Sequence, residues 1–249
     1  MKKKLLVTFI LILMMVVSAC GNNSGSPSQN TDGSTAAKDA SGTITYQSEN
    51  GPVEVPSSPK RIVALTNAPN VLALDGKLVG VDQWTNTNPL FTDKLEGIKV
   101  VSEDELEKII ELEPDLIIAG SETKNLDKLS QIAPTVTFTW GKLDYLAQQL
   151  EIGKLLNKEA ETQAWIDDFK QRAEAAGTEI KAKHGEDVTV SVFETDSKSF
   201  YVFGNNLVRG TEIIYQAMGL NMPGILSFSV GMLVITRSRR RKLGMKSLQ

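Results

Sequence analysis

The sequence predicts an α/β protein in which a long helical segment joins two α/β lobes. Three observations support this prediction. Short runs rich in Val, Ile and Leu alternate with helical segments over residues 61–138, strand signals then stop over residues 143–184, and they resume after Gly185. Strands that alternate with helices at this spacing are typical of a mostly parallel sheet. The order along the chain is therefore lobe, long helix, second lobe.

In the first lobe, residues 61–65 ("RIVAL") and 77–81 ("KLVGV") are predicted strands, and a short helix over residues 70–74 lies between them. Farther along, "DLIIAG" is a predicted buried strand, because it is an apolar run bounded by turn signals. The segments "NLDKLSQI" and "TVTF" repeat the order of helix and then strand. These elements together predict the parallel sheet of the first lobe.

The helix before "DLIIAG" has a predicted start and end. Ser102 followed by Glu105 has the spacing of a capping box, and Pro114 ends the helical pattern. The residues expected to hold this helix against the core are Leu106, Ile109 and Ile110. Glu107, between them, is expected to point outward.

Residues 143–184 are rich in Ala, Glu, Gln, Lys and Leu, with apolar residues at helical intervals. They predict a long helix with one break near Asn157. The segments "VTVSVFE" and "SFYVFG" then predict a pair of strands, followed by a short helix over residues 212–218. This is the start of the second lobe.

The N-terminus has the pattern of an export signal. Three lysines precede an apolar run of about a dozen residues, which ends at Ser18, Ala19 and Cys20. The run is too short to span a bilayer, which takes about 20 apolar residues. The small residues before Cys20 resemble a bacterial lipoprotein signal, in which the thiol is lipidated after cleavage. The alternative is an ordinary secretory signal with a chance cysteine.

The C-terminal end changes in character. From Gly224 onward the chain has six Lys and Arg residues and no Asp or Glu. A change of reading frame explains this composition most simply, and the residues after Pro223 are then expected to be disordered. The alternative is a genuine tail that contacts a membrane or another anionic surface, although its apolar run is too short to span a bilayer.

Six segments in order resemble one family. They are "PKRIVAL", "KLVGVDQW", "LEKIIELEPDLIIAG", "KLSQIAPTV", "LAQQLEIGKLLNKEAE" and "YVFGNNLVRGTEIIYQAMGL". Over about residues 43–223 the chain is similar to the iron-siderophore-binding lipoproteins of ABC importers, in the hydroxamate-type branch. The resemblance implies two α/β lobes bridged by one rigid helix, with the ligand in the cleft between them and the second lobe incomplete after Pro223.

The resemblance also implies a function. A monomeric receptor, anchored on the extracellular face of the cell membrane through a lipid on Cys20, would bind a ferric hydroxamate siderophore. It would then deliver this ligand to the permease of an ABC importer. The siderophore is the transported ligand, and no resident cofactor or metal site is expected. Alternatives are a binder of another iron chelate or a corrinoid, a non-functional truncated receptor, or a surface lipoprotein without a ligand.

Recognition of a ferric hydroxamate needs a fixed cation for the oxygens and aromatic faces for the organic skeleton. By resemblance Arg209 corresponds to the hydroxamate-contacting arginine and Tyr201 to a ligand-facing aromatic residue. Trp84 and Trp140 follow predicted strands, at the strand ends where open α/β sheets bind ligands. The motif "LEKI" resembles a permease-docking motif, which assigns the docking carboxylate to Glu107.

Other function classes have little support in the sequence. The chain has a single histidine and a single cysteine, and no glycine-rich phosphate loop follows a strand, so an enzyme is not expected. No nucleic-acid partner is expected either. The predicted organisation is 1–19 signal peptide, 20–42 flexible tether, 43–141 N-terminal lobe, 142–184 interlobe helical segment, 185–223 partial C-terminal lobe and 224–249 aberrant basic tail.

Overall fold

The computed structural model describes residues 42–196, 199–205, 209–224 and 232–236. The predicted signal peptide, the predicted lipidation site Cys20 and nearly all of the predicted tether lie outside these residues. No helix within the described ranges has both the length and the apolar character needed to cross a membrane.

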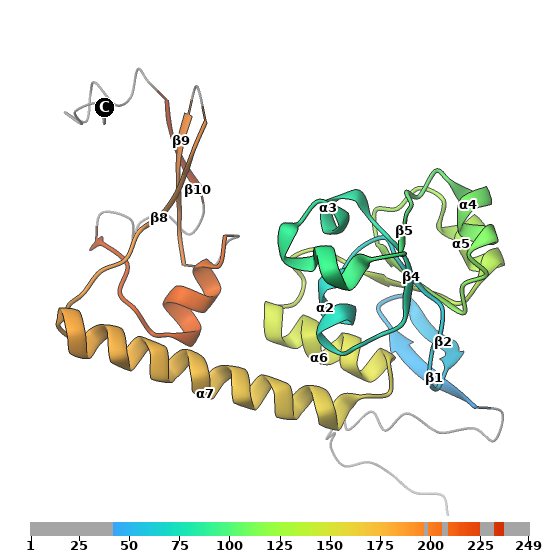
Figure 1. The fold of residues 1–249 in the computed structure, drawn as a ribbon, viewed down its shortest axis with the longest axis horizontal. Helices are drawn as coiled ribbons and strands as arrows, with labels where there is room; N and C mark the ends of the chain where they lie inside the picture. The colour runs from blue at the N-terminus through green and yellow to red at the C-terminus, as the bar shows by residue number, and fades with distance from the viewer. Residues whose placement is uncertain (1–41, 197–198, 206–208, 225–231, 237–249) are drawn as a thin grey trace, which may run out of the picture. The chain divides into compact units, whose positions relative to one another are not determined.

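A five-stranded parallel sheet forms the centre of the first lobe (Figure 1). Its strands, in spatial order, are β5 (Lys99–Val100), β4 (Leu78–Val81), β3 (Ile62–Ala64), β6 (Leu116–Gly120) and β7 (Thr135–Phe138). Every pair of neighbours is parallel. The predicted parallel sheet is confirmed. Its central strands consist of continuous apolar runs, because helices cover both faces of the sheet.

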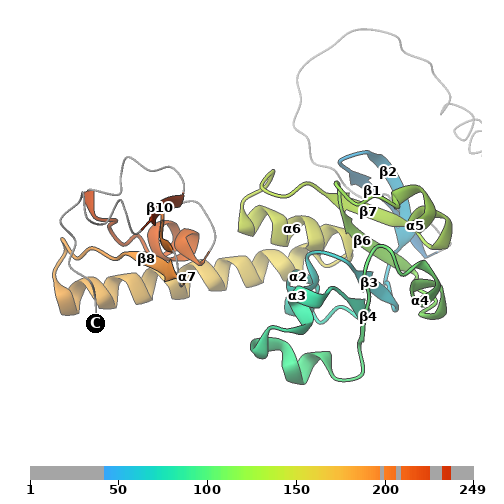
Figure 2. The same ribbon diagram turned by 90° about the horizontal axis from the view of Figure 1, so that it is seen from above.

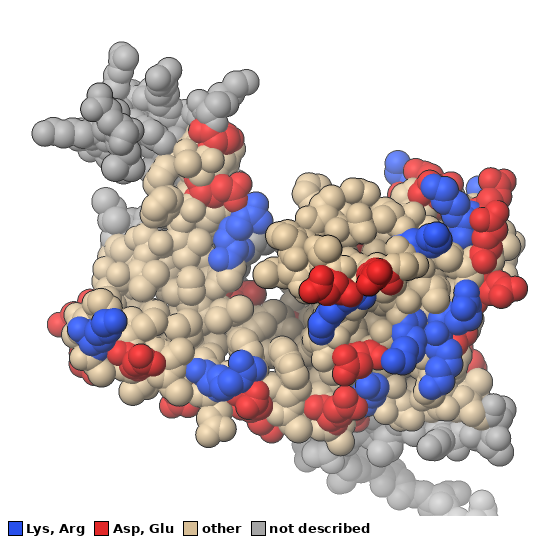
Figure 3. All heavy atoms as spheres, viewed as in Figure 1, with Lys and Arg blue, Asp and Glu red and all other residues tan. Residues whose placement is uncertain are grey.

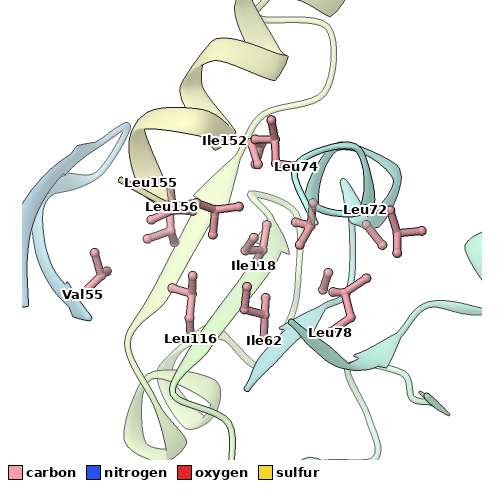
Figure 4. Close-up of a cluster of buried hydrophobic side chains, with 14 of the residues drawn as sticks. Val55, Ile62, Leu72, Leu74, Leu78, Leu116, Ile118, Ile152, Leu155 and Leu156 are labelled. Atoms are coloured by element: carbon pink, nitrogen blue, oxygen red, sulfur yellow. The ribbon is translucent and has the colours of Figure 1, made fainter. Parts of the chain in front are cut away.

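Alternate residues of the central strands point to two different helical layers. Ile62 and Ile118 pack in a cluster with residues of α2 (Ala68–Ala73) and α6 (Tyr145–Leu155). Figure 4 shows this cluster, with Leu74 and Ile152 above the strands. Val63 packs on the other face, with α4 (Leu106–Glu111) and α5 (Leu126–Ile132). The period of two along each strand therefore produces a helix–sheet–helix sandwich.

A β-hairpin that the sequence analysis did not predict precedes this sheet. Strand β1 (Thr43–Ser48) pairs antiparallel with β2 (Gly51–Pro56). The hairpin buries Ile44, Tyr46 and Val55 in the same cluster as α6, and the Tyr46 hydroxyl donates to Glu151 at 2.9 Å. A sequence signal was present, because apolar and polar residues alternate on either side of the segment Glu49–Gly51, which contains an Asn-Gly pair; the two turn residues are Glu49 and Asn50.

Helix α4 differs from its prediction in two respects. It begins at Leu106, after Glu105, whose carboxylate accepts both the Ser102 amide and the Ser102 hydroxyl. The Ser102 side chain therefore does not cap the helix. Ile110 was expected in the core, and this was wrong, because it is 54% exposed whereas Ile109 is fully buried. The buried face of the helix runs instead through Leu106, Ile109 and Leu112, which are spaced three apart.

The predicted break in the long helical segment is confirmed. Helix α6 ends at Leu155, Asn157 adopts a left-handed conformation with φ 55°, and α7 runs over Glu159–His184. The two helices pack closely where they diverge, because a Cβ on Gly153 would lie 2.1 Å from the Thr162 hydroxyl oxygen. Figure 2 shows α6 beside the first turns of α7.

The far end of α7 leads to a second, antiparallel sheet. Its order is β10 (Met232–Thr236), β9 (Ser199–Phe203) and β8 (Val192–Thr195). The predicted pairing of β8 with β9 is confirmed, although β8 begins at Val192. The residues just before β8 do not pair with β9. Instead, the Val190 amide donates a hydrogen bond to the Asn221 carbonyl at 2.8 Å.

Two further features complete this region. The predicted short helix corresponds to η2 (Glu212–Ala217), a helix with π-type hydrogen bonding. The expectation that all residues after Pro223 are disordered was wrong for residues 232–236, which form β10 along the edge of β9. The segment "MLVIT" is rich in residues that favour strands, and an open strand edge recruits such a segment.

Candidate functional site

The candidate site is a cavity of about 540 Å³ at the carboxyl ends of the strands β3, β6 and β7. Residues that directly follow these strands line it: Thr66, Asn67, Ser121, Glu122, Thr139 and Trp140. Helix α6 contributes Asp144, Tyr145 and Gln148, and η2 contributes Glu212. The edge formed by the carboxyl ends of the strands is where open α/β sheets bind ligands.

Trp140 presents an aromatic face at this cavity. It is 83% exposed and lies in a β-turn that the Lys142 amide closes by donating to the Thr139 carbonyl at 3.2 Å. Gly141, the third residue of the turn, has φ 75°, a conformation that type II turns require and that glycine adopts without strain. The turn therefore displays the indole away from the core.

Helix α6 places polar groups at the cavity. Its N-cap residue Asp144 accepts the amides of Leu146 and Ala147 at 2.9 and 2.8 Å. One turn farther along, the side-chain nitrogen of Gln148 is buried and has no hydrogen-bond partner among the described residues. A buried donor without an acceptor is unfavourable, and a ligand oxygen is one means of satisfying it.

Carboxylates make this part of the cavity electronegative. Burial, and then the charge of Asp144, raises the pKa of the Glu212 carboxyl above its ordinary value. Burial, followed by the charges of Glu212 and Asp144, also raises the pKa of the Tyr145 hydroxyl. Lys142 lines the same cavity, but its ammonium group is paired with Glu49 at 3.2 Å. Within the described residues Glu212 has no ion-pair partner.

Arg209 and Tyr201 lie together on one face of the β8–β9 sheet. Glu194 and Tyr201 are directly opposite in the register, so their side chains share that face. The exposed Arg209 donates from Nε to Glu194, and its guanidinium carbon lies 5.8 Å from the centre of the Phe203 ring. The hydrogen bond with Glu194 and the charge of that carboxylate raise the pKa of Arg209. The result is an exposed cation that is paired with Glu194 and lies beside the Phe203 ring.

The remaining predicted residues lie elsewhere. Trp84 is on α3 (Gln83–Asn86), is 88% exposed, and is not among the residues that line the cavity. Glu107 is exposed on α4. The structure thus places Trp140 at the cavity. Arg209 and Tyr201 share one face of the β8–β9 sheet and, like Trp84, are not among the residues that line the cavity. The binding roles of all four predicted ligand-binding residues stay predictions.

The polar residues Asp144, Gln148 and Glu212 were not among the predicted site residues. Asp144 was detectable as a helix N-cap, because an Asp precedes the helical run "YLAQQL". Nothing in the local sequence distinguishes Gln148 or Glu212 from solvent-exposed helix residues. Their presence at one cavity depends on how α6 and η2 are packed.

The described part of the chain contains no group of three or more His, Cys, Asp or Glu side chains arranged to hold a metal ion. On the face in Figure 3, acidic and basic side chains are interspersed over the surface. That face therefore presents no continuous field of one sign to a charged polymer.

A sequence profile of the family described as "Periplasmic binding protein" matches residues 62–224. The chain belongs to the periplasmic binding protein family. The matched residues include the parallel sheet, helix α7 and the β8–β9 pair, so the shared sequence covers both the cavity and the face that carries Arg209.

Individual relatives and solved structures agree with this membership. The chain is 36% identical over 216 residues to the iron(3+)-hydroxamate-binding protein FhuD of Bacillus subtilis (strain 168), a match that covers 85% of this chain and 67% of FhuD. The FhuD protein from S. pseudintermedius matches with a TM-score of 0.69 and 33% identity, over 80% of this chain and 75% of that one.

A further match is FhuD2 from Staphylococcus aureus with bound ferrioxamine B. Its TM-score is 0.66 at 33% identity, and 74% of each chain is covered. These likenesses confirm the predicted α/β fold class and the resemblance to siderophore-binding proteins of the hydroxamate type.

Proposed function

We propose that this periplasmic binding protein binds a ferric hydroxamate siderophore at the strand-end cavity and delivers it to the permease of an ABC importer. One observation carries the proposal. A cavity of about 540 Å³ with an exposed tryptophan lies at the carboxyl ends of β3, β6 and β7, in a chain 36% identical to an iron(3+)-hydroxamate-binding protein. A binding role needs this cavity and no catalytic group.

The chemistry of the ligand suits the residues at the site. In a ferric hydroxamate the siderophore's own oxygens fill the coordination sphere of the iron, so the protein does not need to supply metal ligands. What it must supply is an aromatic surface and hydrogen-bond donors for the oxygens. Trp140 provides the first, and the unpartnered amide nitrogen of Gln148 provides a donor.

Arg209 is the proposed cation for the ligand oxygens. Its Nε donates to Glu194 on the neighbouring strand β8. The terminal guanidinium nitrogens make no hydrogen bond within the described residues, and a planar guanidinium can address two oxygens at once. Tyr201, on the same face of the sheet as Glu194, would contact the organic skeleton of the ligand. Trp84 is proposed as a further aromatic contact.

The charge of the cavity favours this ligand class over its competitors. Glu122, Asp144 and Glu212 line the cavity, and the one lysine there is already paired with Glu49. An iron chelate of carboxylate type carries negative charge and would be repelled. A neutral or cationic hydroxamate complex would not be repelled by these carboxylates.

Two further roles belong to the same proposal. A lipid on Cys20 would hold the protein at the extracellular face of the membrane, because two acyl chains give a stable anchor. Glu107, exposed on α4, would contact an arginine of the permease. Neither role requires a change at the ligand cavity.

Ligand binding can be tested by fluorescence titration of the full chain. Ferrioxamine B is expected to quench tryptophan emission, and Trp140→Phe is expected to remove most of the quenching. Ferric citrate serves as the anionic comparison and is expected to bind more weakly. If calorimetry detects no binding of any ferric hydroxamate, the proposal is wrong.

Anchoring has a separate test. Cys20→Ser should leave the protein as an uncleaved precursor or release it into the medium, as measured by fractionation and mass spectrometry. Normally processed and lipidated protein in that variant would contradict the proposed lipidation site.

A further inference from the structure

One side chain from the turn of the β1–β2 hairpin contacts two residues that line the cavity. Glu49 lies between the two strands and accepts two hydrogen bonds from Thr139. The Thr139 amide donates to Oε1 at 3.0 Å, and the Thr139 hydroxyl donates to Oε2 at 2.6 Å. The ammonium group of Lys142 lies 3.2 Å from the same Oε2. Glu49 and Thr139 are 90 positions apart in the chain, so this contact is purely tertiary.

Thr139 and Lys142 are the first and last residues of the turn that displays Trp140. Glu49 therefore holds both ends of that turn with one carboxylate. The hairpin itself is tied to the adjoining strand β7, because the Asn50 side-chain nitrogen donates to the Thr137 hydroxyl at 2.8 Å. The carboxylate that holds the turn is thus itself held against the sheet.

Burial of its own residues cannot hold the Thr139–Lys142 turn in place. Trp140, Gly141 and Lys142 are all exposed. By contrast, the Glu49 side chain is only 16% exposed, although it is a carboxylate on a hairpin turn. Charge-assisted hydrogen bonds to a carboxylate are stronger than neutral ones, and a partly covered carboxylate loses less of that strength to water.

We propose that Glu49 is a positioning residue, which fixes the Thr139–Lys142 turn and so presents the Trp140 indole to the ligand before binding. The consequence for ligand affinity rests on the proposed function, whereas the effect on the turn does not. A turn that is already ordered does not have to be ordered on binding, and this preserves affinity. Loss of the Glu49 carboxylate is therefore expected to raise Kd by roughly two- to tenfold.

The experiment uses the full chain with Trp140 as its only tryptophan. The chain has three tryptophans, and Trp84→Phe with Trp165→Phe removes the other two. In this background Glu49→Ala is compared with Glu54→Ala. Glu54 is the matched control, because it lies on the same hairpin and hydrogen-bonds to Thr45 of that hairpin, away from the turn.

Two quantities are measured for each variant. The first is the fluorescence anisotropy of Trp140 without ligand, which reports the mobility of the turn. The second is the Kd for ferrioxamine B. Glu49→Ala is expected to lower the anisotropy and raise Kd, and Glu54→Ala is expected to change neither. Glu49→Gln keeps an oxygen acceptor for Thr139 and is expected to restore most of the anisotropy.

The variants also separate positioning from stability. Thermal unfolding of each variant shows whether it is folded. If Glu49→Ala does not fold, Thr139→Val replaces it in the comparison, because that change removes only the hydroxyl donor to Glu49. Equal anisotropy and equal Kd in the Glu49→Ala and Glu54→Ala proteins would overturn the proposal. If the unmutated chain binds no ferric hydroxamate, the proposed function fails, and the anisotropy without ligand still decides whether Glu49 holds the turn.

Discussion

Gly177 on α7 lies directly against the Met218 carbonyl at the end of η2. A Cβ built on Gly177 would be 1.9 Å from that oxygen and 2.8 Å from its carbon. The close approach brings η2, and with it Glu212, onto the long helix. The glycine is therefore needed for contact between two backbones rather than for an unusual conformation.

Gly177→Ala is expected to destabilise the protein, because the clash is with backbone atoms that cannot move aside. Overpacking of this kind costs about 1–3 kcal/mol. In an ordinary helix the same change is stabilising by about 1 kcal/mol, so the sign of the effect is the test. Chemical denaturation measures it, with Ala175→Ser at an exposed position of α7 as the control. A more stable Gly177→Ala protein would contradict the close approach.

Arg209→Ala is expected to weaken binding of a ferric hydroxamate by about 1.5–3 kcal/mol, the range for hydrogen bonds to charged groups. Isothermal calorimetry with ferrioxamine B measures the change. Arg172→Ala is the matched control, because Arg172 is also exposed and paired with a carboxylate, Asp168, but lies on α7. An unchanged Kd for Arg209→Ala would remove this residue from the proposed site.

Glu212→Gln is expected to stabilise the protein at neutral pH. Burial, and then Asp144, raises the pKa of the Glu212 carboxyl above its ordinary value of 4.5. A raised pKa contributes stability at acid pH that is lost as pH rises through the pKa of the folded state. Glutamine avoids that loss.

Thermal unfolding as a function of pH tests this expectation. The Glu212→Gln protein should have the higher Tm at pH 7, and the advantage should disappear below about pH 4, where the wild-type carboxyl is protonated. Glu179→Gln, at an exposed position of α7, is the comparison. A Tm difference that does not depend on pH would show that the Glu212 carboxyl does not carry this penalty.

Glu107→Arg is expected to abolish delivery of the ligand to the permease while leaving ligand affinity unchanged. Charge reversal places two cations opposite each other if an arginine of the permease is the partner. Binding of the ligand-loaded protein to membranes that contain the permease is the measurement. Glu111→Arg, at another exposed position of α4, is the control. Equal loss in both variants would show a general effect of positive charge and not a specific contact.

The sequence predicted those parts of the fold that depend on local patterns. The apolar runs at Ile62–Ala64 and Leu116–Gly120 indicated buried parallel strands, and both are central in the sheet. The predicted break near Asn157 is present, between α6 and α7. Prediction was less successful at helix α4, where three apolar residues were available and only the packing decided that Ile109 is buried and Ile110 exposed.

The candidate site was less accessible to local reasoning. Trp84 and Trp140 had equivalent positions in the sequence, each just after a predicted strand, and the structure places only Trp140 among the residues that line the cavity. The hairpin that carries Glu49 was missed, and so was the role of that residue.

The sequence by itself determined the alternation of strands and helices, the helix that follows Asn157 and the membership of a binding-protein family. These follow from periodicity and from residue order, which neighbouring positions in the chain establish. Only the tertiary structure decided that Glu49 holds the turn of Trp140, that Arg209 pairs with Glu194, and which polar groups meet at the cavity. The physical reason is that these contacts join segments far apart in the chain, and their geometry depends on how whole elements pack against one another.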